Sequence, residues 1–332
     1  MSKWREYAFN YALLLFCLLS IAITPAHADH ASLSFADGGS GPIITLPAAT
    51  MPQGKLAVSL SCEYIRSDRF SDAELARLAG RHIHAHSADW TLVKSLGVDY
   101  GLADNLLLSV QAPRVHRENV RSGSHAHVGG VVLNGVDELG DSTGFGDIGI
   151  LGKYRFWKKA FHQAALLAGV KTPTGRTHVR KDGARLETEH QPGSGSWDGL
   201  FGFAASTKAG PVSLDANALY ALVTEGSQNT DLGDKANYNF AMSYRIDGES
   251  DNRQAFDLVL ELNGEWSDQK KQAGRLDENS GGNTIYLTPG FRYAPDAKWS
   301  AHFAAGVPVV SNLGRGHSET DFRITLGIAR SF

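Results

Sequence analysis

The final stretch of the chain constrains the fold more than any other part. Phe322, Ile324, Leu326 and Ile328 lie two residues apart with small or polar residues between them, and the chain stops at Phe332. A period of two is that of a β-strand with one apolar face. A transmembrane barrel gains from such a strand, because its last strand pairs with its first and removes both edges of the sheet. The terminal aromatic residue fits the girdle at a membrane interface, so we expect a transmembrane β-barrel.

Residues 1–28 have the pattern of a cleavable signal peptide. Lys3 and Arg5 supply positive charge, and the apolar run over 11–23 is too short to span a bilayer. Ala26–Ala28 has the small-x-small form of a cleavage site. We expect the chain to be exported and the mature protein to begin after residue 28.

The composition of the whole chain argues against several classes of protein. After the signal no apolar run is long enough for a transmembrane helix. The mean hydropathy of −0.22 is mildly polar, but a barrel hides its apolar residues by alternation and gives a similar average. The formal net charge of −3 argues against nucleic acid as a partner. Cys62 is the one cysteine after the signal, so no internal disulfide is expected.

Most of the mature chain alternates apolar and polar residues in segments of strand length. About twelve such strands follow one another, an even number that places both ends of the chain on the same, periplasmic side of the membrane. Short turns such as 101–104 alternate with long polar connections such as 66–89 and 113–143. This asymmetry favours an outer-membrane barrel over a soluble β-sandwich or propeller. We predict an all-β fold, an antiparallel up-and-down transmembrane barrel over 54–332, with short periplasmic turns and long outer loops in the bacterial outer membrane.

The segment 29–53 does not alternate cleanly. It is rich in Gly and Pro and carries an apolar patch over 43–46. We expect it either to lead into the barrel from the periplasm or to fold into the lumen. Barrels of eight strands are filled by side chains and barrels of 16–18 strands are open, so a barrel of about twelve lies between them. The lumen is therefore either a narrow channel or blocked by long side chains, by loops or by this segment.

Charged residues at alternate strand positions are candidates for the lumen wall. A Lys or Arg side chain on the lipid face costs about 2–4 kcal/mol at the membrane midplane, so such residues should point inward. Buried charges need partners, and we expect ion pairs across the lumen; the alternative is a charge-lined constriction. The candidates are Glu63, Asp99, Lys153, Arg155, Lys171, Asp215, Arg245, Glu261, Glu265, Arg292 and Arg323.

Several short motifs, taken together, resemble one known family. They are Gly144–Ile148, Lys153–Phe156, Leu46–Ala48, Tyr100–Asp104 and Lys171–Gly175. With these motifs the chain resembles the outer-membrane proteins grouped as the MetA-pathway of phenol degradation family, which are described as transporters. The resemblance covers most of the mature chain. It implies a barrel that passes aromatic or other hydrophobic small molecules.

Histidines are concentrated in the segments predicted as outer loops. His82, His84 and His86 form an alternating run, and His125 and His127 form a second pair. If the first run is extended, its imidazoles share one face and could hold Zn²⁺, Cu²⁺ or Ni²⁺. The alternative is a set of solvated loop histidines, because no acidic residue or cysteine lies at a fixed spacing from them. No other cofactor is expected.

The residues and the resemblance together predict a function in transport. We expect an outer-membrane channel or transporter for small molecules, with aromatic or hydrophobic compounds as candidates, and no enzymatic activity. The expected partners are outer-membrane lipid, a small-molecule solute, and the barrel-assembly machinery, which would recognise the C-terminal strand. One alternative is a metal-binding or metal-transport protein that uses the histidine-rich loops. The other is an outer-membrane barrel hydrolase, although no spacing singles out a nucleophile.

Overall fold

The part of the chain that the structure covers begins inside the predicted 29–53 segment. The predicted signal peptide therefore lies outside the described residues. Among the helices of the described parts, none is long and apolar enough to cross a membrane. The computed structural model describes residues 41–128, 131–247 and 254–332, and within these ranges all side chains except those of 126–128, 131–132 and 247.

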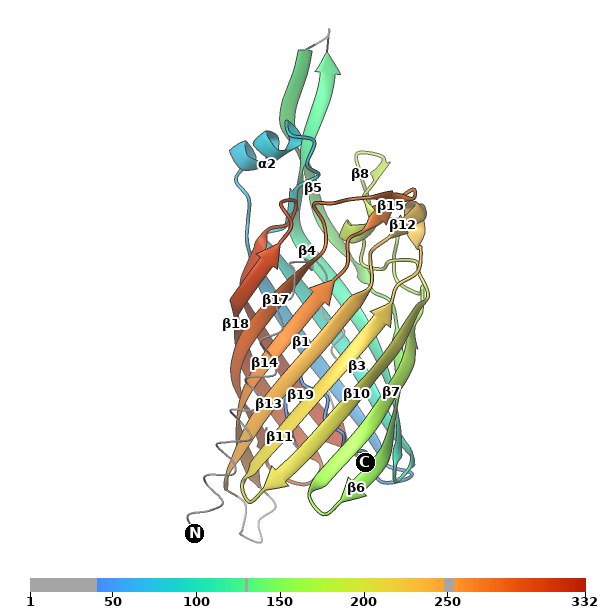
Figure 1. Cartoon of the computed structure of the whole chain (residues 1–332), viewed down its shortest axis with the longest axis vertical. Helices are drawn as coiled ribbons and strands as arrows, with labels where there is room; N and C mark the ends of the chain where they lie inside the picture. Colours follow the sequence, from blue (N-terminus) through green and yellow to red (C-terminus); the bar gives the residue numbers. More distant parts are fainter. Residues whose placement is uncertain (1–40, 129–130, 248–253) are drawn as a thin grey trace.

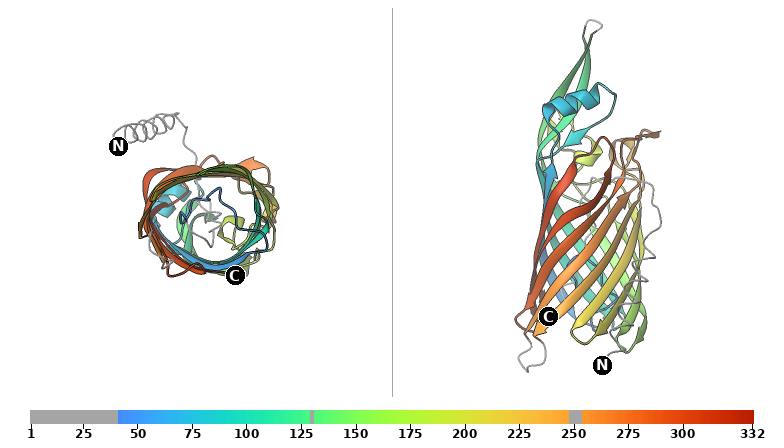
Figure 2. Two further views of the ribbon diagram at one scale, coloured as in Figure 1. Left: turned by 90° about the horizontal axis from the view of Figure 1, so that it is seen from below. Right: turned by 60° about the vertical axis from the view of Figure 1, so that its left-hand side comes forward.

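Twelve long strands form one closed antiparallel barrel, which confirms the predicted fold class (Figure 1). The first strand pairs with the last, with Leu60 opposite Ile328, and the ring closes between β4 and β6, with Val110 opposite Ile150. Seen from below, the strands surround a lumen in which a segment of chain lies (Figure 2, left). The barrel strands are β1 (Leu56–Asp68), β3 (Trp90–Ala103), β4 (Leu106–Val128), β6 (Gly149–Lys159), β7 (His162–Lys171), β10 (Asp198–Ala209), β11 (Val212–Leu222), β13 (Lys235–Asp247), β14 (Ala255–Ser267), β17 (Gly282–Ala294), β18 (Trp299–Leu313) and β19 (Glu319–Ser331).

The closing strand β19 has the two faces that its sequence predicts. Leu326 and Ile328 are exposed on the outside of the barrel, whereas Arg323 is buried inside it. The backbone N–H of Phe332 donates to the carbonyl oxygen of Leu56 at 2.8 Å, so the end of the chain is hydrogen-bonded to the start of the first strand. Both edges of the sheet are thereby removed.

The outside of the barrel wall is an apolar belt. On β14, Leu258 and Leu260 are 48 % and 41 % exposed, whereas Asp257 and Glu261, on the other face of the same strand, are 5 % and 1 % exposed. Apolar side chains turned outward and charged side chains turned inward are the reverse of a soluble protein. This arrangement suits a wall that faces lipid.

The segment 113–143, predicted as a long loop, is mostly strand. β4 continues beyond the barrel to Val128 and returns as β5 (Val131–Phe145), and the two form a hairpin that projects from the outer end (Figure 1). Its residues outside the barrel are largely polar, although Val136 packs against the buried cluster of α2. Alternation of apolar and polar residues therefore did not predict this hairpin, because that pattern arises only where one face of a strand is buried or faces lipid.

The segment 66–89, predicted as a polar loop, contains a helix. The helix α2 (Asp72–Ala79) begins after Ser71, whose hydroxyl caps its first turn. Leu75 packs with Ile83 in a small buried cluster beneath the β4–β5 hairpin. The other short elements of the outer loops are β2 (His86–Ser87), β8 (Arg180–Lys181), β9 (Ala184–Arg185), η1 (Thr188–His190), η2 (Ser227–Asn229), β12 (Thr230–Asp231), β15 (Lys271–Gln272) and β16 (Arg275–Leu276).

Candidate functional site

The lumen is occupied by residues 41–50, here named the plug segment (Figure 2, left). Of the two positions expected for 29–53, the described part takes the one inside the barrel. Glu261 on β14 anchors it: its carboxylate accepts the backbone N–H groups of Ile43 at 2.5 Å, Ile44 at 3.1 Å and Thr45 at 3.2 Å. A carboxylate that receives several N–H groups makes charge-assisted hydrogen bonds, which are the stronger kind.

Two cations of the wall bind the carbonyl groups of the plug segment. Arg292 on β17 donates to the carbonyl oxygens of Gly41 and Pro42, and Lys153 on β6 donates to that of Pro47 at 2.9 Å. Residues 41–50 are not paired with a strand in any of the described sheets, so their backbone groups need other partners inside the barrel. The charged wall side chains supply them.

The plug segment also rests on an apolar part of the wall. Leu46 lies in a buried cluster with Leu167 of β7, Leu200 of β10 and Leu219 of β11. The inward faces of these strands are only partly polar, because apolar residues such as Leu200 and Leu219 lie there beside Ser206 and Asn217. The reason is that the inward face here contacts the plug segment rather than water, as in sheets that are covered on both sides.

Other lumen charges form pairs with one another. Arg323 is buried, donates to Glu265 at 2.5 Å, and lies 3.9 Å from Glu63. Lys171 lies 2.6 Å from Asp198. Asp198 is directly opposite Lys171 on the neighbouring strand, so this pair lies along the wall and not across the lumen. Such pairs satisfy buried charges that would otherwise be costly.

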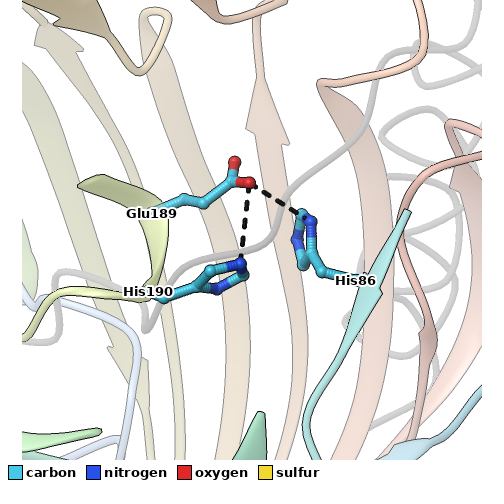
Figure 3. Close-up of side chains that lie close together, drawn as sticks. All are labelled: His86, Glu189 and His190. Atoms are coloured by element: carbon cyan, nitrogen blue, oxygen red, sulfur yellow. Dashed lines mark ion pairs between the residues drawn. The ribbon is translucent and has the colours of Figure 1, made fainter. Parts of the chain in front are cut away.

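At the outer end of the barrel, several loops meet at a buried group of charged and imidazole side chains. We name His86, Glu189, His190, Lys270 and His317 the outer cluster. Glu189 Oε1 lies 3.2 Å from His86 Nδ1 and 3.9 Å from His190 Nε2 (Figure 3). The other carboxylate oxygen, Oε2, lies 2.7 Å from Lys270 Nζ. The rings of His86 and His317 are in edge contact, with centroids 4.9 Å apart.

The charges of the outer cluster shift its pKa values. Burial acts to raise the pKa of Glu189, but His86 and Lys270 beside it outweigh this and hold the pKa well below its usual range. Burial, and then the neighbouring Glu189, raise the pKa of Glu187. Two carboxyl groups are thus crowded together next to one ammonium group.

A cavity of about 170 Å³ is lined by the plug segment, by the barrel wall and by loops of the outer end. Ile43 and Ile44 form its inner boundary, and Gln191 lies at its outer boundary. Val93 and Val115, buried on the inward faces of β3 and β4, give the wall an apolar patch. We name this cavity the chamber. It can hold a small molecule that has both an apolar part and a polar or charged group, because ion-paired side chains such as Lys171 also line it.

The structure places the remaining lining candidates at different depths of the barrel. Asp99 and Asp215 are buried and accept hydrogen bonds from serine hydroxyls of the wall. Arg155 lies at the inner rim, where it donates to the carbonyl oxygen of Asp104. Arg245 is paired with Asp257 at 2.7 Å. These four residues are therefore structural partners of the wall and do not line the chamber.

The structure does not bring the predicted histidines together. His82 and His84 are exposed whereas His86 is buried, and His82 ends the turn after α2 at a φ of +57°. His82 touches the ring of His125, with centroids 5.4 Å apart. The side chain of His127 lies outside the described residues. Of the predicted set, His86 alone is in the outer cluster.

Sequence reasoning missed the partners of His86. Glu189 and His190 lie adjacent in η1, about a hundred residues further along the chain, and Lys270 lies in another loop. An acidic residue beside a histidine in a polar loop is a weak signal. It was also missed that Asn217 and Ser206 would accept plug N–H groups, since a single polar residue on a wall strand looks like any other.

Comparisons with known proteins agree with this architecture. A family model described as "Putative MetA-pathway of phenol degradation" matches residues 67–317. Among solved structures, the COG4313 outer membrane channel from Pseudomonas putida F1 is 17 % identical with a TM-score of 0.60, covering 86 % of this chain and 98 % of that one. The CymD monoaromatic hydrocarbon channel is 10 % identical with a TM-score of 0.40, covering 85 % and 89 %. The Ralstonia pickettii toluene transporter TbuX is 11 % identical with a TM-score of 0.41, covering 85 % and 90 %. A search of curated protein sequences found no relative.

Proposed function

The chain belongs to the MetA-pathway of phenol degradation family, and from this premise we propose that it is an outer-membrane channel for small aromatic or otherwise hydrophobic molecules. The chamber carries the proposal. Its volume of about 170 Å³ is similar to that of an apolar protein cavity of about 150 Å³ that binds benzene. The solved structure with a TM-score of 0.60 is that of an outer membrane channel, and its likeness supports the same barrel architecture.

The two ends of the chamber define what passage requires. The plug segment lies on its periplasmic side and the outer loops lie on its other side, so a solute that crosses the barrel has to move past both. The hydrogen bonds from Glu261, Arg292 and Lys153 set the cost of moving the plug segment. Apolar side chains such as Val93 favour solutes with an aromatic or aliphatic part. The expected partners of the barrel are outer-membrane lipid and, through β19, the barrel-assembly machinery.

The test compares one substitution on the two faces of one strand. Val93 and Val98 are both on β3, but Val93 is buried in the chamber and Val98 faces outward. The solute is benzoate, which has an aromatic ring and crosses lipid slowly when charged. We expect Val93→Phe to slow benzoate efflux from proteoliposomes several-fold and Val98→Phe to leave it unchanged. Equal rates for wild type and Val93→Phe, or no efflux above empty liposomes, would overturn the proposal.

Hydrolysis at the outer rim is a second candidate, and one arrangement favours it. His116 contacts the hydroxyl of Thr143 through Nδ1 and the carboxylate of Glu118 through Nε2, the latter at 2.9 Å. A hydroxyl, an imidazole and a carboxylate in this order are the parts of a hydrolase triad. If this arrangement is catalytic, an ester is hydrolysed by the wild type and not by Thr143→Ala; absence of esterase activity in the wild type removes this candidate.

A further inference from the structure

The outer cluster is a feature that passage through the chamber does not require. Its members come from four segments: β2 and η1 supply His86, Glu189 and His190, while the loops after β14 and β18 supply Lys270 and His317. His86, Glu189, His190 and His317 are each less than a tenth exposed. Burying imidazole and carboxylate groups costs free energy unless they have partners, so a cluster of them gathered from several loops needs an explanation beyond solvation of a surface.

The geometry of three of these residues fits a metal ion. Glu189 Oε1 lies 3.2 Å from His86 Nδ1 and 3.9 Å from His190 Nε2, and the three ligand atoms all lie within 4.8 Å of one another. Zn²⁺ binds imidazole nitrogen and carboxylate oxygen at about 2.0–2.2 Å, which places tetrahedral ligands roughly 3.3 Å apart. The three atoms in Figure 3 therefore surround a point from which each can reach one ion after small movements.

We propose that His86, Glu189 and His190 bind one Zn²⁺ ion, and that this ion fastens the loop carrying His86 to the loop carrying Glu189 over the outer end of the lumen. Two imidazoles and one carboxylate form a donor set that zinc sites use. The ring of His317 is in edge contact with that of His86, so a further imidazole adjoins the site. The proposal is independent of which solute the chamber takes.

The charge balance of the site supports a divalent cation. Glu189 and Asp277 both lie near Lys270, at 2.7 Å and 3.5 Å, and Glu187 interacts directly with Glu189. Three carboxyl groups, those of Glu187, Glu189 and Asp277, are thus gathered around the one ammonium group of Lys270. A divalent ion offsets the negative charge of such carboxyl groups when they are ionised.

The contacts of Glu189 also orient its carboxylate for binding a metal. Lys270 Nζ holds Oε2 at 2.7 Å, so the other oxygen, Oε1, is the one directed at the two imidazoles. Partners that hold the outer oxygen of a ligating carboxylate are common at metal sites and orient the ligand. The ion would replace the long contact between Oε1 and His190 with two short bonds.

Zinc titration of the refolded full-length protein tests the site. We expect isothermal titration calorimetry to find one Zn²⁺ per chain, and His86→Ala, Glu189→Gln and His190→Ala each to weaken binding at least about tenfold. The matched controls are His84→Ala and His125→Ala, which remove exposed histidines of neighbouring segments and should leave binding unchanged. Heat-modifiable migration in gels shows which variants are folded barrels.

Three results would overturn the inference. They are absence of Zn²⁺ binding to the folded wild type, unchanged binding in folded His86→Ala and Glu189→Gln, and loss of binding in the two control variants. A second measurement tests the fastening: trypsin cleavage within residues 180–191 should be faster in EDTA than in excess ZnCl₂ for the wild type, and equal in both for Glu189→Gln. Both readouts are independent of benzoate efflux, so the zinc site and the channel function can fail separately.

Discussion

The lumen has two different walls, and the plug segment touches both. Strands β14 and β17 present a polar wall, on which Glu261 and Arg292 bind the plug backbone. Strands β7, β10 and β11 present an apolar wall, on which Leu200 and Leu219 pack against Leu46. All of these strands alternate and all face lipid on the outside. They differ in which part of the plug segment their inward faces contact: its backbone or its apolar side chains.

The difference shows how an irregular segment is held inside a barrel. The backbone of the plug segment brings N–H and C=O groups that must find partners away from water. The polar wall provides the carboxylate of Glu261 and the guanidinium group of Arg292, and Lys153 of β6 provides a second cation. Its side chains at Leu46 and Ala48 bring apolar surface, and the apolar wall covers it. The polarity of each inward face is thus set by its contact with the plug segment rather than by a rule for barrels in general.

The largest effect is expected from the polar wall. Glu261→Gln replaces one acceptor oxygen by an NH₂ group that faces N–H donors, and each buried N–H left without an acceptor costs about 1–3 kcal/mol. Two such groups weaken the docking of the plug segment by about 3 kcal/mol, so the amides of residues 43–45 should exchange on the order of 100-fold faster in hydrogen-exchange mass spectrometry. Asp257→Asn, on the same strand but bonded to Arg245, is the control. Unchanged exchange would show that the plug segment does not depend on Glu261.

A smaller effect is expected from the apolar wall. Leu46→Ala removes apolar surface from a buried cluster, which costs about 2 kcal/mol at the low end of such substitutions, since the end of the segment can adjust. Single-channel recordings in planar bilayers should then show more frequent openings than the wild type. Leu60→Ala, on the lipid face, serves as the matched control. If both variants conduct alike, the apolar wall contributes nothing to closure.

The smallest effect is expected where one hydroxyl binds the plug segment. Ser206 Oγ accepts the N–H of Ala48 at 2.8 Å and donates to Asp215 at 2.5 Å. Ser206→Ala should cost about 1 kcal/mol and speed exchange of the Ala48 amide roughly fivefold. Among the described residues Ser243 Oγ has no hydrogen-bond partner, so Ser243→Ala should change nothing. A larger effect from Ser206→Ala than from Glu261→Gln would reverse the ranking of the contacts.

Much of the barrel could be predicted because the alternation of each strand is set by residues that are neighbours in the sequence. Each strand must expose apolar residues to lipid, so Leu258 and Leu260 alternate with Asp257 and Glu261 within one short stretch. The β4–β5 hairpin and α2 were not predicted, since they lie outside the membrane and need no continuous apolar face. The inward position of a charged residue was visible in the sequence, but its partner was not.

By itself the sequence determined the closed barrel, its strand number, and the lipid and lumen faces, because period-two alternation and loop asymmetry are properties of neighbouring residues. Only the tertiary structure decided that residues 41–50 fill the lumen, and that Glu189 and His190 meet His86. Glu261 is more than two hundred residues from Ile43 and Ile44, and Glu189 about a hundred from His86. Such contacts depend on which strands the closed ring brings face to face, and no spacing along the chain encodes them.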